Sequence, residues 1–139
     1  MGAEQLITSG TQNGELKLKS LVDIAGQNFI VTGAAKGIGL AISSLFNSLG
    51  AKVSGWDLDD SGMKNNPVFA DSQIVDVTNP LQTKEGFAAS LAALGDIDGV
   101  IANAGVNGPT KPLWDYSLSE WQMVTVSYTH LTLPTSYPV

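Results

Sequence analysis

A glycine-rich stretch near the start of the chain has the most specific chemical pattern in the sequence. Residues 32–39 read TGAAKGIG, with glycines at positions 33, 37 and 39. Gly33 would permit a tight turn, Gly37 would let the backbone approach a pyrophosphate, and Gly39 would let a helix pack closely on a sheet. A helix that begins here would offer free N–H groups to phosphates. No Gly-Lys-Ser/Thr sequence closes the run, which excludes a P-loop.

A carboxylate follows at the spacing expected for ribose recognition. Asp57 ends a predicted strand and could accept hydrogen bonds from both ribose hydroxyls of NAD, while repelling a 2′-phosphate. Lys36 points weakly toward NADP, because a cation beside the glycine turn could pair with that phosphate. No Arg or Lys follows Asp57 directly, and Asp59 and Asp60 read as loop charges. We therefore expect NAD rather than NADP; the alternative for Asp57 is an ordinary solvated carboxylate.

The elements that would hold these residues alternate between strands and helices. Short apolar runs predict strands, spacings of three and four predict helices, and Asn79-Pro80 and the Ser117-x-x-Glu120 capping box mark helix starts. Strands are expected at 28–32, 52–57, 73–77 and 97–103, and helices at 37–49, from 79 to about 94, and from 117. A full helix between the second and third strands is not expected. This order predicts an α/β fold with a Rossmann-like, doubly wound parallel sheet.

Two helix faces are expected to be buried. In the first helix, the apolar face would consist of Ile38, Ala41, Ile42, Leu45 and Leu49, with Gly50 as the helix stop. In the last helix, Trp121, Val124 and Met123 would face inward.

Composition narrows the function classes. The 139 residues suit one domain, and 43% hydrophobic residues permit a buried core. No 18-residue apolar run predicts a membrane span, and the N-terminus lacks a secretory pattern. With no Cys there are no disulfides or Cys nucleophiles, and we expect no metal site. Seven basic residues and a net charge of −6 disfavour nucleic acid as a partner, so we expect a cytoplasmic protein with a small-molecule substrate.

Four features together resemble the short-chain dehydrogenase/reductase family over about residues 22–126. They are TGAAKGIG, Asp57, Asp76-Val77 and Asn103-Ala104-Gly105. The resemblance implies the N-terminal part of a Rossmann domain in an NAD(P)-dependent oxidoreductase. Such an enzyme moves hydride between nicotinamide and an alcohol or ketone carbon. The loop before Tyr116 suggests the 3-oxoacyl reductase-like or sugar dehydrogenase-like branches.

The resemblance also assigns roles to residues. Asp76 and Val77 would contact adenine, and Asn103, Ala104 and Gly105 would support the sheet and line the nicotinamide side; the alternative for Asn103 is that it bonds only backbone. The implied cofactor-binding set is Gly33, Lys36, Gly37, Ile38, Gly39, Asp57, Asp76, Val77, Asn103, Ala104 and Gly105. Family members assemble as homotetramers or homodimers through two helices beside the active site, and we expect this chain not to reproduce that assembly.

The catalytic pattern of the family is missing from the sequence. The family needs a Ser and a Tyr-x-x-x-Lys, in which the Lys lowers the Tyr pKa. Here the last Lys is Lys111, and Glu120 and Thr132 stand four residues after Tyr116 and Tyr128. Ser127 stands where a relay Asn is expected. We therefore predict no catalytic residues and no turnover, and a non-catalytic dinucleotide-binding module is the alternative function.

The end of the chain differs in character from the rest. Residues 121–139 carry no Asp, Glu, Lys or Arg, and Pro134 would break a helix that the family continues. The string VSYTHLTLPTS is also similar to C-termini produced when a reading frame runs into sequencing-adapter DNA. We expect a flexible lead-in at 1–26, a partial NAD(P)-binding domain at 27–126 and a non-native tail at 127–139. A truncated paralogue and a genuine divergent tail are the alternatives.

Overall fold

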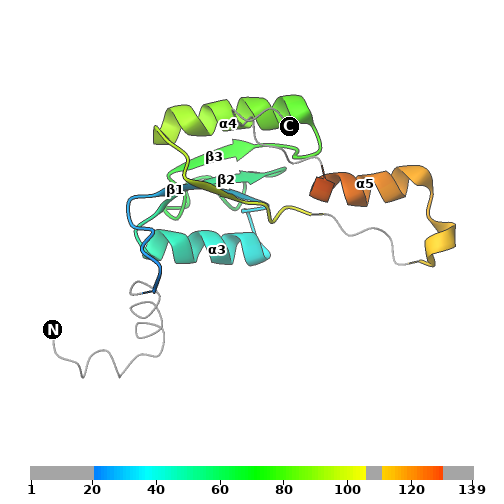
Figure 1. Ribbon diagram of the computed structural model, residues 1–139, viewed down its shortest axis with the longest axis horizontal. Helices are drawn as coiled ribbons and strands as arrows, with labels where there is room; N and C mark the ends of the chain where they lie inside the picture. Colours follow the sequence, from blue (N-terminus) through cyan, green and yellow to red (C-terminus); the bar gives the residue numbers. More distant parts are fainter. Residues whose placement is uncertain (1–20, 106–110, 130–139) are drawn as a thin grey trace, which may run out of the picture.

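The computed structural model describes residues 21–105 and 111–129. A four-stranded sheet lies between two helices, α3 (Gly37–Ser48) on one face and α4 (Pro80–Leu94) on the other (Figure 1). The strands are β1 (Asn28–Thr32), β2 (Lys52–Asp57), β3 (Asp71–Ile74) and β4 (Gly99–Ile101). A short 3-10 helix, η1 (Leu113–Asp115), precedes α5 (Leu118–Thr129).

The sheet has the strand order β3-β2-β1-β4, and all of its pairings are parallel. The chain therefore leaves β1, builds β2 and β3 to one side, and returns to place β4 on the other side. This is the expected Rossmann-like α/β topology, with a reversal of strand order between β1 and β4. Ligands of such folds bind outside the carboxyl ends of the strands at that reversal.

Alternating residues of β1 fill the core on both faces of the sheet. Ile30 packs with Trp56 and Phe87 toward α4, whereas Val31 packs with Ile42 and Phe46 toward α3. Successive strand side chains point to opposite faces, so a strand covered on both sides is apolar throughout. Ile30 and Val31 are both fully buried, as expected for a central strand.

The third and fourth strands differ from the expected ranges. β3 covers Asp71–Ile74 rather than 73–77, because the Asp76 carboxylate accepts hydrogen bonds from the backbone and hydroxyl of Thr78 and turns the chain away. β4 covers only Gly99–Ile101 rather than 97–103, since the Asn103 N–H bonds to Ile101 O and to the Thr32 hydroxyl. As expected, no helix joins Asp57 to Asp71.

The predicted face of α3 is wrong in part. Ile38 is 73% exposed and Leu45 is 37% exposed, whereas Gly39 and Ser43 are buried. The helix turns its small residues to the sheet, which brings its backbone close, and Ile42 and Phe46 fill the remaining space. Gly50 does end the helix with a positive φ of 90°.

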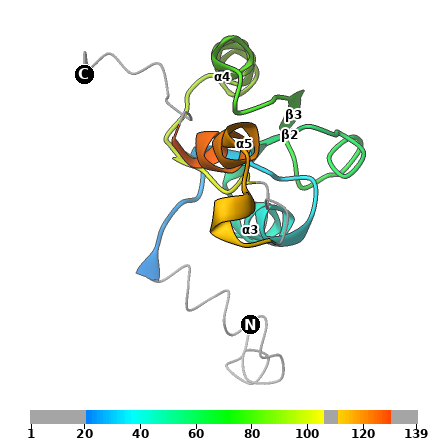
Figure 2. The same cartoon turned by 90° about the vertical axis from the view of Figure 1, so that its right-hand side faces the viewer.

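The predicted burial of α5 is also wrong. Trp121 and Met123 are 49% and 50% exposed. The cause is the position of α5, which lies beyond the end of the sheet rather than on it (Figures 1 and 2). Trp121 meets Tyr116 edge-to-face, with ring centroids 6.4 Å apart. The predicted capping box is confirmed: Glu120 N–H donates to the Ser117 hydroxyl, and Ser117 N–H donates to the Glu120 carboxylate.

Two predicted segments lie wholly or partly outside the described residues. They are the lead-in at 1–26, described only from residue 21, and the tail at 127–139, described only to residue 129. Within the described chain, no helix has the length and apolar character needed to cross a membrane.

Candidate functional site

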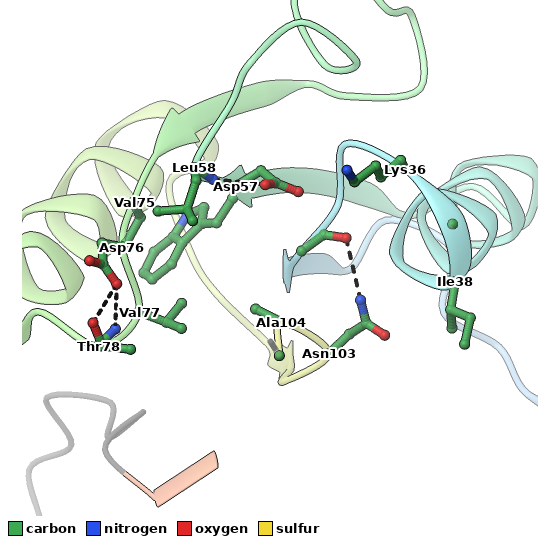
Figure 3. A pocket seen from close by; sticks show the side chains of 14 residues that line it. Lys36, Ile38, Asp57, Leu58, Val75, Asp76, Val77, Thr78, Asn103 and Ala104 are labelled. Atoms are coloured by element: carbon green, nitrogen blue, oxygen red, sulfur yellow. Dashed lines mark hydrogen bonds between the residues drawn. The ribbon is translucent and has the colours of Figure 1, made fainter. Parts of the chain in front are cut away.

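A cleft of about 510 Å³ opens at the carboxyl ends of the strands (Figure 3). It is bounded by the turn after β1, the end of β2, the chain that follows β3 and the chain that follows β4. All of the predicted site residues except Gly39 line it. The lining residues are Gly33, Lys36, Gly37, Ile38, Trp56, Asp57, Leu58, Val75, Asp76, Val77, Thr78, Asn103, Ala104 and Gly105.

The three glycines of the turn differ in what surrounds them. A Cβ on Gly33 would lie 2.9 Å from Ala104 Cα, so this position needs glycine for close packing as well as for its φ of 66°. A Cβ on Gly39 would overlap the Gly33 carbonyl, so this position needs glycine for close packing of the helix start on the turn, and Gly39 does not line the cleft. Gly37 has a φ of 60°, and a Cβ there would meet no atom within 4 Å.

The N-terminal end of α3 therefore presents open backbone to the cleft. α3 begins at Gly37, and the Lys36 side chain makes no capping hydrogen bond to it. The first N–H groups of a helix have no partner inside the helix, and they carry the positive end of its dipole. This arrangement suits the phosphates of a dinucleotide.

Thr32 and Asn103 tie the glycine turn to the end of β4. The fully buried Thr32 hydroxyl accepts hydrogen bonds from the backbone N–H groups of Asn103 (3.1 Å) and Ala104 (3.0 Å). The Asn103 amide donates to the carbonyl oxygens of Thr32 (3.2 Å) and Gly33 (3.3 Å). Asn103 thus bonds backbone and fixes the floor of the cleft, which matches the alternative considered for it from sequence.

The Asp57 carboxylate is held against the glycine turn. Its Oδ2 accepts a hydrogen bond from Ala35 N–H (3.0 Å), and its Oδ1 accepts one from Leu58 N–H (2.8 Å). Each carboxylate oxygen has more than one acceptor direction. Asp57 can therefore remain bonded to the turn and still accept a hydroxyl from the cleft.

Asp76 shapes the opposite side of the cleft through its own loop. Its Oδ1 accepts from Thr78 N–H (2.9 Å) and from the Thr78 hydroxyl (2.6 Å). Its backbone N–H donates to the Gln82 side chain (2.9 Å). The neighbouring Val75 and Val77 are buried, so this side of the cleft combines a polar loop with an apolar wall.

Sequence reasoning missed four residues that line the cleft: Trp56, Leu58, Val75 and Thr78. Leu58 is 63% exposed and directly follows Asp57, a place in the chain that could have indicated it. Trp56 is buried, and its indole N–H donates to the Ser90 hydroxyl (2.9 Å). That contact joins β2 to α4, residues 34 positions apart, and no local pattern shows it.

Among the described residues, no group of three or more His, Cys, Asp or Glu side chains could hold a metal ion. The strand order, the glycine turn and the cleft at the point of reversal instead define the class of protein. The described part of the chain is a Rossmann-like α/β unit of the kind that binds dinucleotides.

Comparison with known proteins identifies the family. A family model described as enoyl-(acyl carrier protein) reductase matches residues 33–133. A relative from Sphingomonas sp. (strain SKA58), 2-dehydro-3-deoxy-L-rhamnonate dehydrogenase (NAD(+)), is 32% identical over 103 residues, which cover 72% of this chain and 41% of the relative. The chain belongs to the short-chain dehydrogenase/reductase family. It spans about two fifths of the length of that relative.

Solved structures of the same family share the fold. A short-chain dehydrogenase/reductase from Burkholderia phymatum in complex with NAD is 27% identical, with a TM-score of 0.71 over 79% of this chain and 43% of that one. A metagenomic short-chain oxidoreductase in complex with NADP is 29% identical, with a TM-score of 0.69 over 76% of this chain and 51% of that one. Proteins similar to this chain thus bind either dinucleotide.

Proposed function

We propose that this chain forms the nucleotide-binding part of an NAD-dependent short-chain dehydrogenase/reductase. The observation that carries the proposal is the cleft lined by the glycine turn, Asp57, Asp76 and Asn103. These residues come from four separate segments, and the fold brings them to one edge of the sheet.

We propose a task for each part of the cleft from the chemistry of the residues that line it. The pyrophosphate would lie over Gly37 and the start of α3, where backbone N–H groups are open and no Cβ intrudes. Asp57 would accept the ribose hydroxyls, and the wall of Val75, Asp76 and Val77 would lie beside adenine. Asn103, Ala104 and Gly105, which line the cleft together with Ile38, would lie on the nicotinamide side.

The preference for NAD rests on charge. Asp57 is fixed by two backbone hydrogen bonds, so it would meet a 2′-phosphate with an anion that cannot swing away. Like charges held close together are costly wherever water is excluded. The relative named as an NAD(+) dehydrogenase and the Burkholderia phymatum structure with NAD support NAD as the cofactor. The metagenomic structure with NADP makes NADP the alternative to test.

The whole protein would transfer a hydride between nicotinamide and an alcohol or ketone carbon, with a proton moving to or from the substrate oxygen. The sequence given has no Tyr-x-x-x-Lys to move that proton. We propose that this chain alone does not turn over. The substrate class would be sugar dehydrogenase-like or 3-oxoacyl-like, and the match to a rhamnonate-derived sugar acid dehydrogenase favours the former.

Two further expectations remain proposals. Residues 127–139 are proposed to be foreign or divergent sequence, although α5 continues to Thr129 and the family match continues to residue 133. Assembly as a homotetramer or homodimer is proposed for the whole protein and not for this chain.

Titration of NAD⁺ and NADP⁺ into the 139-residue chain tests the proposal. We expect NAD⁺ to bind more tightly than NADP⁺, with no reduction of NAD⁺ when a panel of sugar acids and secondary alcohols is added. Preference for NADP⁺ would overturn the specificity, and substrate-dependent reduction would overturn the proposed inactivity. A monodisperse chain with submicromolar affinity for NAD⁺ would favour the second candidate, a non-catalytic dinucleotide-binding module.

A further inference from the structure

A network of hydrogen-bonded side chains lies between the sheet and α4. Ser54 on β2 and Ser90 on α4 are both fully buried, and their Oγ atoms are 2.7 Å apart. The Ser54 hydroxyl donates to the Asp71 carboxylate on β3 (2.6 Å). The Trp56 indole N–H donates to Ser90 Oγ (2.9 Å). Side chains from two strands and one helix are thus connected from the edge strand to the indole.

The donors and acceptors of this network fit one direction. An ionised carboxylate can only accept, so the hydrogen of the Ser54 hydroxyl points to Asp71. The hydrogen of the Ser90 hydroxyl is then the one that bonds Ser54 Oγ, which leaves Ser90 Oγ to accept from Trp56. Gln73 donates to the other Asp71 oxygen (3.0 Å) and helps to hold the carboxylate. The Ser90 oxygen is therefore held as the acceptor for the indole.

The indole that the network holds is part of the cleft. Trp56 lines the cleft, is 1% exposed, and packs in one cluster with Val75 and Val77. A Cβ on Gly86 would lie 2.7 Å from Val75 Cγ2 and 3.3 Å from Trp56 Cζ2, so α4 packs directly on both side chains. Val75 and Val77 belong to the wall proposed to lie beside adenine, which we call the adenine wall. The position of the indole therefore sets the shape of the adenine wall.

We propose that Ser90 is a positioning residue for the adenine end of the cleft, acting through the indole of Trp56. The inference rests on the proposed function of the cleft and deepens it. A buried polar network holds a core in one arrangement when all of its members are satisfied. Among the described residues, no buried side-chain N or O atom lacks a hydrogen-bond partner. Ser90 does not line the cleft, so its effect on a bound base passes through the side chain that it holds.

The test compares two ligands, 5′-AMP and inorganic pyrophosphate. 5′-AMP carries the base, whereas pyrophosphate can occupy only the phosphate end of the cleft at the glycine turn. S90A removes the acceptor of the indole. W56F removes the indole N–H, so S90A combined with W56F shows whether the effect passes through Trp56. T83V is the matched control, because Thr83 is also buried on α4 and its hydroxyl donates to the Asn79 carbonyl at the start of the same helix.

In titrations followed by amide resonances, with all variants folded, S90A should raise the Kd for 5′-AMP about threefold to tenfold. This lies in the range for residues that act on a site without touching its ligand. The Kd of S90A for pyrophosphate should change less than about twofold, and T83V should change neither Kd by more than that. In the W56F chain, S90A should have no further effect on either Kd, as expected if the two residues act as one unit.

The indole resonances give a second readout. The chain has three Trp residues, and the resonance of Trp56 is the one that disappears in W56F. Addition of 5′-AMP to the unaltered chain should shift this resonance. It should not shift those of Trp114 and Trp121, which are exposed and lie outside the cleft. If S90A does not fold, S54A takes its place, because it removes the acceptor that orients the Ser90 hydroxyl, and it should also weaken 5′-AMP more than pyrophosphate.

Equal weakening of 5′-AMP and pyrophosphate would overturn the inference, because Ser90 would then act through stability of the fold alone. An undiminished effect of S90A in the W56F chain would overturn it as well. If 5′-AMP binds the unaltered chain but S90A leaves its Kd unchanged, this inference fails and the proposed function stands. If neither ligand binds the unaltered chain, the proposed function fails and the inference falls with it.

Discussion

Replacement of Gly37 by alanine separates binding of a pyrophosphate from stability of the fold. Gly37 opens α3 with a φ of 60°, and a Cβ there would meet no atom within 4 Å. Gly37 lines the cleft, so we expect the added methyl group to occupy open space beside the backbone N–H groups that a ligand would use. The fold therefore has room for the alanine side chain, whereas a phosphate bound over Gly37 would collide with it.

The size of the effect follows from two separate costs. An alanine in the left-handed region costs about 1–2 kcal/mol of the free energy of unfolding. A ligand pushed away from the helix start would lose a hydrogen bond to a charged group, worth about 1.5–3 kcal/mol. At about 1.4 kcal/mol per factor of ten, G37A should raise the Kd for NAD⁺ by roughly 10-fold to 150-fold.

The matched control is G95A. Gly95 lies at the C-terminal end of α4 with a φ of 86°, and a Cβ there would also meet no atom within 4 Å. It does not line the cleft. G95A should therefore lose about as much stability as G37A in chemical denaturation but bind NAD⁺ like the unaltered chain. Equal affinities for G37A and G95A, in calorimetric titrations under conditions where both remain folded, would refute the assignment of Gly37 to the phosphates.

Other perturbations test separate parts of the structure. D57N should weaken NAD⁺ binding about fivefold to tenfold, since a charged hydrogen-bond acceptor contributes about 1 kcal/mol more than a neutral one. In the same titration, D57N should also reduce the ratio of the affinity for NAD⁺ to the affinity for NADP⁺. An unchanged ratio of these affinities would argue against Asp57 as the ribose ligand. S90A should cost about 1–3 kcal/mol in urea denaturation, because it leaves the buried Trp56 indole N–H without its acceptor; a loss below about 0.5 kcal/mol would show that water or another group replaces it. Hydrogen bonds from Lys111 and, to a lesser extent, from the backbone and hydroxyl of Ser117 lower the pKa of Glu120 from 4.5 to about 2. The pKa of Glu120 is lower in the folded chain than in the unfolded chain. The ionised carboxylate therefore stabilises the start of α5 fully above about pH 4.5, and this stabilisation is lost as the pH falls toward 2. The helical circular dichroism signal of the unaltered chain should fall over that pH window, and E120Q should lack this part of the acid-induced fall. An acid profile of E120Q identical to that of the unaltered chain would contradict the role given to Glu120.

Features specified by a few adjacent residues could be predicted from the sequence. The glycine turn, the start of α4 at Asn79-Pro80 and the capping box at Ser117 all appear as expected. Asn79 accepts hydrogen bonds from the N–H groups of Leu81 and Gln82, a geometry that its side chain can form without distant partners. Local chemistry of this kind is visible in the sequence because it depends on short spacings.

Features that depend on distant contacts could not be predicted. Apolar spacing suggested Ile38 and Leu45 as the buried face of α3, but the helix instead packs through Gly39 and Ser43, where close approach to the sheet outweighs side-chain hydrophobicity. The early end of β3 depends on which partner the Asp76 side chain finds, and that partner is Thr78. Trp121 would be buried only if another part of the protein packed against α5, and it is 49% exposed. The spacing of apolar residues in a helix indicates that such packing would be favourable, but not that a partner surface is present.

The site lies between these two cases. The residue types and order of the glycine turn, Asp57 and Asn103 predict a cleft for a dinucleotide, and the fold brings them together at one sheet edge. The hydrogen bonds that fix Asp57 to Ala35 and Asn103 to Gly33 join residues 22 and 70 positions apart. No spacing rule gives such contacts, because they depend on the parallel register of β2 and β4 with β1.

The central claim is that this cleft binds a dinucleotide, and mapping of amide resonances during an NAD⁺ titration tests it most directly. In ¹⁵N-labelled chain, we expect the largest shifts at Gly33, Gly37, Leu58, Val77 and Ala104, which line the cleft from four segments. The amide of Trp121, which lies on α5 outside this cleft, is the internal control and should not shift. Shifts confined to α5, or no shifts at millimolar NAD⁺, would contradict the account.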